Sequence, residues 1–272
     1  MTLTNILQRA ILDLRLAITS ILCGNSATVS LSIGQKFPFA LSSFTWRAAE
    51  TLIPVAAKQA ESPVTRAPEL LKFGTRISLG LAAPGAVALS LIAGSLLHAW
   101  LGRDMPEVVG IMRIASLAVV ADACGLAALH LLWGEGRGWS VFLIFAGSAA
   151  LCLSVTWTLA PHFGPVAAAY GLLASATSGS IGFLVVACKY RLISVLKLLV
   201  DCIAGLLFPL LILGGVIFAI GRTYHGDLGA PRLLLAVALG TLCYLLTLYW
   251  LGMSQEERAA ARVLLDRARS RA

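Results

Sequence analysis

Four of the polar residues between positions 36 and 50 are spaced so that they lie on one side of a helix. Lys36, Ser43, Arg47 and Glu50 follow one another at intervals of seven, four and three residues. At about 3.6 residues per turn, these intervals return to the same face. Such a stripe in an apolar helix predicts a water-filled groove or a second helix beside it. Its cations could bind an anionic ligand, whereas an internal network pairing Arg47 with Glu50 is the alternative.

A second group of charges lies near the beginning of the chain, where Arg9, Asp13 and Arg15 interrupt an apolar segment. Arg9 and Asp13 are four residues apart and could form an ion pair on a helix. We expect Arg15 to join the cationic wall of the groove. The candidate substrate-binding residues are therefore Arg15, Lys36, Ser43, Arg47 and Glu50.

Asp122 and His130 lie eight residues apart, which places them on one face of a helix. Ionisable residues inside membrane helices can carry protons or ions, so both are candidates for proton or ion coupling. A structural polar contact is the simpler interpretation of two isolated residues.

Motifs of soluble enzymes and of metal sites are missing from the sequence. It contains no Walker loop, GxSxG, HExxH or GxGxxG motif, and its six cysteines form no CxxC pair. We therefore expect no enzymatic activity, no catalytic residue, no cofactor and no metal.

The composition indicates that a bilayer solvates this chain. Of its 272 residues, 58% are hydrophobic and 12% are charged, against roughly 25% charged residues in soluble domains. A membrane-spanning helix needs about 20 apolar residues. The sequence predicts an all-α, polytopic membrane helix bundle over residues 1–253 with about eight transmembrane helices, followed by a basic amphipathic cytoplasmic tail over 254–272. The predicted helices are 3–23, 27–57, 72–101, 107–133, 138–159, 163–188, 195–221 and 232–252.

Lysine and arginine are distributed unevenly between the two sets of predicted loops. One set, with the tail, holds thirteen of them, from Lys58 to Arg271, and the other holds only Arg103, Arg222 and Arg232. Basic loops remain in the cytoplasm, so both termini are predicted to be cytoplasmic. The net charge of +8 is then a topology signal rather than a nucleic-acid footprint, and membrane lipid is the expected partner.

Several short motifs occur in an order that resembles Wzx-type O-antigen and polysaccharide flippases, of the multidrug/oligosaccharidyl-lipid/polysaccharide exporter superfamily. The resembling segments are Ile33-Gly34-Gln35-Lys36-Phe37-Pro38 with Leu52-Ile53-Pro54, Ala99-Trp100-Leu101-Gly102, Arg113-Ile114, Leu132-Trp133-Gly134-Glu135-Gly136-Arg137, and Phe163-Gly164-Pro165-Val166-Ala167-Ala168-Ala169.

The resemblance implies one lobe, the C-terminal half, of a two-lobed flippase-like fold in the bacterial inner membrane. The first two helices of each lobe line the central cavity in that family, and here they are the helices with most charge. The implied substrate is an anionic oligosaccharide linked to undecaprenyl diphosphate. The implied partner is a separate N-terminal flippase lobe. An alternative function is a quinol-oxidising membrane anchor subunit of a respiratory reductase, in which Asp122 and His130 would serve quinone chemistry.

Overall fold

The computed structural model describes residues 2–54, 57, 67–191, 193–223 and 230–248, and this part of the chain contains helices but no strand. The all-α prediction is therefore confirmed for these residues. The long helices are α1 (Thr2–Cys23), α2 (Asn25–Glu50), α4 (Ala67–Leu101), α5 (Pro106–Gly134), α6 (Gly138–Phe163), α7 (Val166–Arg191), α8 (Val195–Thr223) and α9 (Ala230–Thr247).

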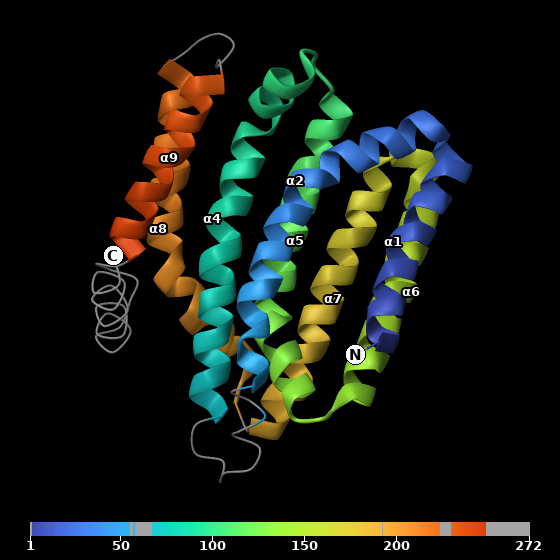
Figure 1. Ribbon diagram of the computed structural model, residues 1–272, viewed down its shortest axis with the longest axis vertical. Coiled ribbons are helices and arrows are strands. Elements are labelled where there is room, and N and C mark those ends of the chain that lie inside the picture. The colour runs from blue at the N-terminus through green and yellow to red at the C-terminus, as the bar shows by residue number, and fades with distance from the viewer. Residues whose placement is uncertain (1, 55–56, 58–66, 192, 224–229, 249–272) are drawn as a thin grey trace.

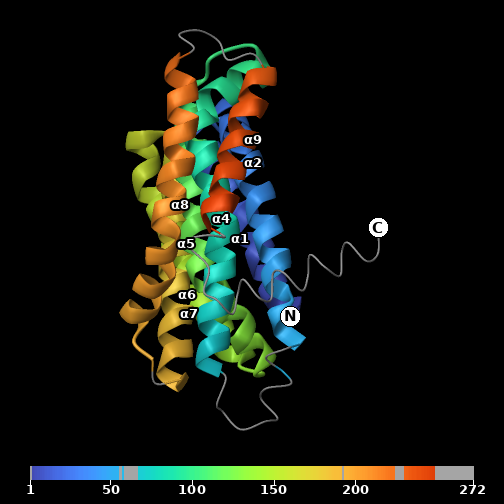
Figure 2. The same ribbon diagram turned by 90° about the vertical axis from the view of Figure 1, so that its left-hand side faces the viewer.

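Successive helices run in alternating directions along the long axis of one bundle (Figure 1). The α8–α9 pair forms one edge of the bundle, and α1 with α6 forms the opposite edge. Turned by 90°, the bundle is narrower, so the helices form a flattened assembly (Figure 2). Helix α5 lies inside it and packs against α2, α4 and α7, which explains why most of its length is buried.

Within the described residues, five helices are long and apolar enough to cross a membrane: α4, α5, α6, α7 and α8. They support a multi-pass membrane protein. Helices α1 and α2 do not meet this criterion, and the apolar part of α9, Leu235–Thr247, is shorter. Eight membrane spans therefore remain a prediction.

The ends of three helices differ from those predicted. Helix α6 passes through Pro161, near which a break was predicted, and ends at Phe163. Pro161 removes only one backbone donor, whereas Gly164 adopts φ 57° and its N–H donates to the Ala160 carbonyl at 3.0 Å, which closes the helix. Helix α4 begins at Ala67 and takes Pro68 into its first turn, a position that proline tolerates.

Helix α2 ends at Glu50, before the predicted limit at residue 57. The predicted tail over 254–272 lies outside the described residues.

Candidate functional site

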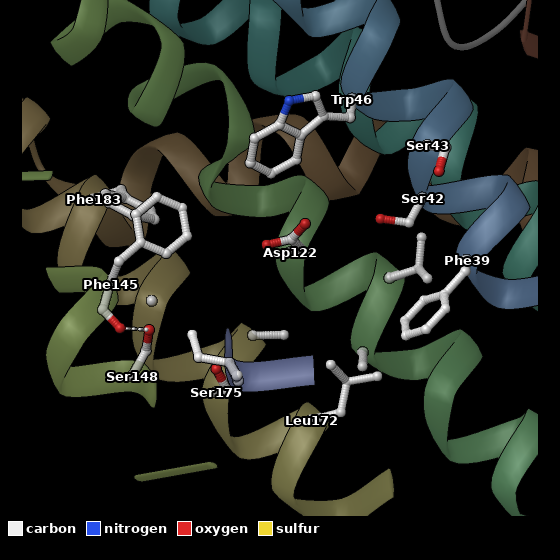
Figure 3. A pocket seen from close by; sticks show the side chains of 15 residues that line it. Phe39, Ser42, Ser43, Trp46, Asp122, Phe145, Ser148, Leu172, Ser175 and Phe183 are labelled. Atoms are coloured by element: carbon white, nitrogen blue, oxygen red, sulfur yellow. Dashed lines mark hydrogen bonds between the residues drawn. The ribbon is translucent and has the colours of Figure 1, made fainter. Parts of the chain in front are cut away.

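A pocket of about 420 Å³ lies between α1, α2, α5, α6 and α7 (Figure 3). Helix α1 contributes one lining residue, whereas α2 contributes four and α7 contributes five. The residues that line it are Ile11, Phe39, Ser42, Ser43, Trp46, Ala118, Val119, Asp122, Phe145, Ser148, Leu172, Ser175, Ala176, Gly179 and Phe183.

The lining combines aromatic rings, hydroxyl groups and one carboxylate. Asp122 is the one ionisable residue of this described lining, and its carboxylate points into the pocket (Figure 3). Among the described residues, no side chain forms an ion pair or a hydrogen bond with that carboxylate. The hydroxyls come from Ser42, Ser43, Ser148 and Ser175, and the aromatic rings from Phe39, Trp46, Phe145 and Phe183.

Close packing of α5 against α7 fixes the position of Asp122. Gly125 lies against Ser180 so tightly that a Cβ on Gly125 would be 2.5 Å from the Ser180 Cα. The Ser180 hydroxyl also donates to the backbone carbonyl of Asp122 at 3.2 Å. Both contacts hold the two helices together directly beside the pocket wall.

His130, the second predicted coupling residue, lies outside the lining. It is fully buried, and its ring stacks on Trp133 with a centroid distance of 5.5 Å. Trp46 packs edge-on against the same imidazole at 5.3 Å and also lines the pocket. Both ring nitrogens of His130 lack a hydrogen-bond partner among the described residues. Trp46 therefore lies between the pocket and an unpartnered buried imidazole.

Arg15 is not on the same surface as the cations of α2. Its residue is only 1% exposed, and Nη2 donates to Gln35 Oε1 at 2.7 Å while Nη1 reaches the Ala168 carbonyl at 3.5 Å. The guanidinium also lies 5.9 Å from the centroid of the Phe39 ring. Because Phe39 lines the pocket and Arg15 does not, the expected contact of Arg15 with an open groove is absent from this structure.

The predicted stripe on α2 is exposed along its length, whereas its spacing predicts a groove or a second helix beside it. Lys36, Ser43, Arg47 and Glu50 are all exposed, but only Ser43 also lines the pocket. Lys36 Nζ lies 5.9 Å from the centroid of the Trp100 ring, and no ion pair joins Arg47 to Glu50 within the described residues. The stripe and the pocket therefore lie on neighbouring faces of α2. Ser43 is the residue of the stripe that also lines the pocket.

Sequence reasoning missed Trp46, Ser42, Ser148 and Ser175. Serines and aromatic residues are ordinary in membrane helices, so none of these residues stands out from the sequence. Their spacing could have identified the α2 members of this set. Phe39, Ser42, Ser43 and Trp46 recur at helical intervals and share one face.

Comparison of the chain with protein-family models and with curated proteins gives no match. The resemblance to flippases therefore remains an expectation.

Proposed function

We propose that the chain is a membrane transporter for a lipid-linked oligosaccharide, and that the pocket beside Asp122 holds the saccharide. The observation that carries this proposal is the lining itself, in which hydroxyls, a carboxylate and aromatic faces converge on one pocket whose walls include the membrane-length apolar helices α5, α6 and α7. Its volume of about 420 Å³ lies within the range of small-molecule sites.

The lining fits a sugar better than it fits an ionic headgroup. Serine hydroxyls donate and accept hydrogen bonds, and the Asp122 carboxylate accepts them, so together they can satisfy the hydroxyls of a saccharide. The faces of Trp46 and Phe39 offer apolar area against which the C–H side of a sugar ring can pack. A diphosphate would find no cation among the described residues of this lining.

A place for the diphosphate exists on the neighbouring face of α2. Lys36 and Arg47 are exposed there, eleven positions apart, which corresponds to about 16 Å along a helix. Ser43 belongs to both the exposed stripe and the pocket. A ligand that crosses the edge of α2 at Ser43 can place its sugar inside and its phosphates beside Arg47 or Lys36, with its lipid chain in the bilayer.

Asp122 is the residue that we assign to proton or ion coupling. Because it is the one charged group of the described lining, a proton or cation that binds there changes the electrostatics of the whole pocket. His130 becomes a second acceptor only if the Trp46 ring moves aside.

The proposal places the protein in the bacterial inner membrane with both termini in the cytoplasm. The exposed face of α2 would then be covered by a separate helical lobe, because Lys36, Arg47 and Glu50 are expensive to leave in lipid. No observation favours the quinol-anchor alternative, because His130 does not face the pocket.

Equilibrium binding to the protein in lipid nanodiscs tests the proposed function. The probe is a fluorescent oligosaccharide linked to undecaprenyl diphosphate, and undecaprenyl phosphate without sugar is the competitor. We expect Trp46→Ala to weaken binding about tenfold or more, because it removes a stacking face. Trp139→Ala is the matched control, since Trp139 is 70% exposed and lies outside the pocket.

Binding of the probe with unchanged affinity by both variants would contradict this placement of the sugar. Equal competition by the sugar-free lipid would contradict saccharide recognition altogether.

A further inference from the structure

Helix α4 contains a backbone carbonyl whose normal helical partner is missing. In an α-helix the N–H of residue i donates to the carbonyl of residue i−4, and proline has no N–H. Pro84 lies inside α4, so the carbonyl of Gly80 loses its intrahelical donor. In a bilayer no water replaces such a donor, and the carbonyl needs another partner.

Tyr244 of α9 supplies that partner. Its hydroxyl donates to the Gly80 carbonyl at 2.9 Å, and the residue is only 1% exposed. The Tyr244 ring also packs in a cluster with Ala88 and Ile92 of α4 and Leu213 and Ile217 of α8. The hydrogen bond therefore joins α9 to the proline segment of α4 from within the packed interior.

The same segment of α4 contacts the pocket-lining helix α2. Gly85 follows Pro84, and a Cβ at Gly85 would lie 2.6 Å from Leu41 Cδ1. Leu41 directly precedes Ser42 and Ser43, which line the pocket. Nearer the start of α4, Gly74 packs in a similar way on Leu52, beyond the end of α2. Bending of α4 at Pro84 would therefore shift the pocket-lining part of α2.

Helices α8 and α9 contribute no residue to the described lining, and their principal contacts outside their own pair are with α4. We infer that Tyr244 is a positioning residue: by satisfying the Gly80 carbonyl it holds α4 in the form that keeps α2 packed and the pocket narrow. The α8–α9 pair therefore supports α4 and, through α4, determines the width of the pocket. This inference concerns the shape of the pocket and does not depend on which cargo the pocket carries.

The test uses a cysteine-free version of the full chain in nanodiscs, with Ser175→Cys as the reporter inside the pocket. The measured quantity is the rate at which a water-soluble maleimide labels Cys at this position. We expect Tyr244→Phe to raise this rate by about tenfold, because an unsatisfied buried carbonyl favours any conformation that rehydrates it. Tyr190→Phe, at an exposed position of α7, is the matched control and should leave the rate unchanged.

A second background separates the hydrogen bond from simple packing. Pro84→Ala restores a backbone N–H at position 84, which can donate to the Gly80 carbonyl. Tyr244→Phe should therefore have no effect on the labelling rate in Pro84→Ala protein. Circular dichroism and a monodisperse elution profile establish that each variant is folded. An unchanged rate in folded Tyr244→Phe protein, or an equal effect in both backgrounds, would overturn the inference. If the labelling rates follow this expectation but the unsubstituted protein does not bind the sugar-lipid, the proposed function alone is contradicted.

Discussion

Arg15 is a cation that the bundle keeps away from both solvent and lipid. Its partners among the described residues are the Gln35 amide oxygen, the Ala168 carbonyl and the ring of Phe39, and no carboxylate pairs with it. Those contacts join α1 to α2 and α7. A buried charge is retained only where its hydrogen bonds offset part of its desolvation, so we assign Arg15 the structural role of holding α1 against α2 and α7.

Removal of Arg15 should destabilise the fold rather than alter one binding step. We expect Arg15→Ala to lower the free energy of unfolding by about 3 kcal/mol, because Gln35 loses its donor and a cavity remains. The double variant Arg15→Met with Gln35→Leu should recover most of the loss, because it removes both polar groups together. Denaturant titration in mild detergent measures these changes. Lys36→Ala, at an exposed position, is the control and should leave stability nearly unchanged.

A stability unaffected by Arg15→Ala would mean that the guanidinium contributes no net free energy through its contacts with Gln35 and Ala168.

At the residue scale, periodicity placed the four polar residues of the α2 stripe on one face but did not predict which face of α2 lines the pocket. Lys36, Arg47 and Glu50 were expected to line a groove because their spacing is helical, yet the pocket lies on the adjoining face with Trp46. Only packing against neighbouring helices, chiefly α5, decides between two neighbouring faces, and α5 is distant in the sequence: Trp46 packs on His130, 84 positions away. Asp122 was identified because an acid inside an apolar helix is rare.

At the scale of elements, glycine permits a close helix contact beside the site. Gly125 brings α5 against Ser180 of α7, which positions Asp122 in the pocket wall. Helix positions were predictable because long apolar segments and glycine-rich turns alternate along the chain. The end of α6 at Phe163 was not predicted. Pro161 is tolerated near the end of this helix, and Gly164 terminates it.

Because α5 and α7 pack so closely at Gly125, one added methyl group there should lower stability, whereas the same change elsewhere on α5 should not. Gly125→Ala should lower the free energy of unfolding by about 1–3 kcal/mol, since the added Cβ would meet the Cα and the side chain of Ser180. Gly110→Ala on the same helix is the matched control, because nothing lies within 4 Å of a Cβ there. Equal stabilities of the two variants in the same denaturant titration would show that α5 and α7 approach less closely than described.

At the scale of the whole molecule, alternating helix directions give the bundle two chemically different ends. Arg137 lies at the turn between α5 and α6, and Lys189 and Lys197 flank the connection from α7 to α8 at the same end (Figure 1). The turn between α4 and α5, with Arg103, lies at the other end. The positive-inside rule then predicts that the end with Arg137 faces the cytoplasm.

Labelling of single cysteines from either side of the membrane tests this orientation. Ser194→Cys, between α7 and α8, should react with a membrane-impermeant maleimide only from the cytoplasmic side of vesicles of known sidedness. Asp104→Cys, between α4 and α5, should react only from the opposite side. Both positions are exposed, so access rather than burial decides the result. Labelling of both from one side would be incompatible with α4 to α8 crossing the membrane in alternation.

Photo-crosslinking of the cargo to defined positions on α7 tests most directly whether the pocket is the binding site. A photoreactive amino acid replaces Leu172, which lines the pocket, or Ile181, which is 53% exposed on the same helix and is not part of the lining. With a radiolabelled saccharide on undecaprenyl diphosphate, we predict an adduct at position 172 that excess unlabelled sugar-lipid displaces, and little adduct at position 181. Equal or stronger capture at position 181 would contradict binding of the saccharide in the pocket.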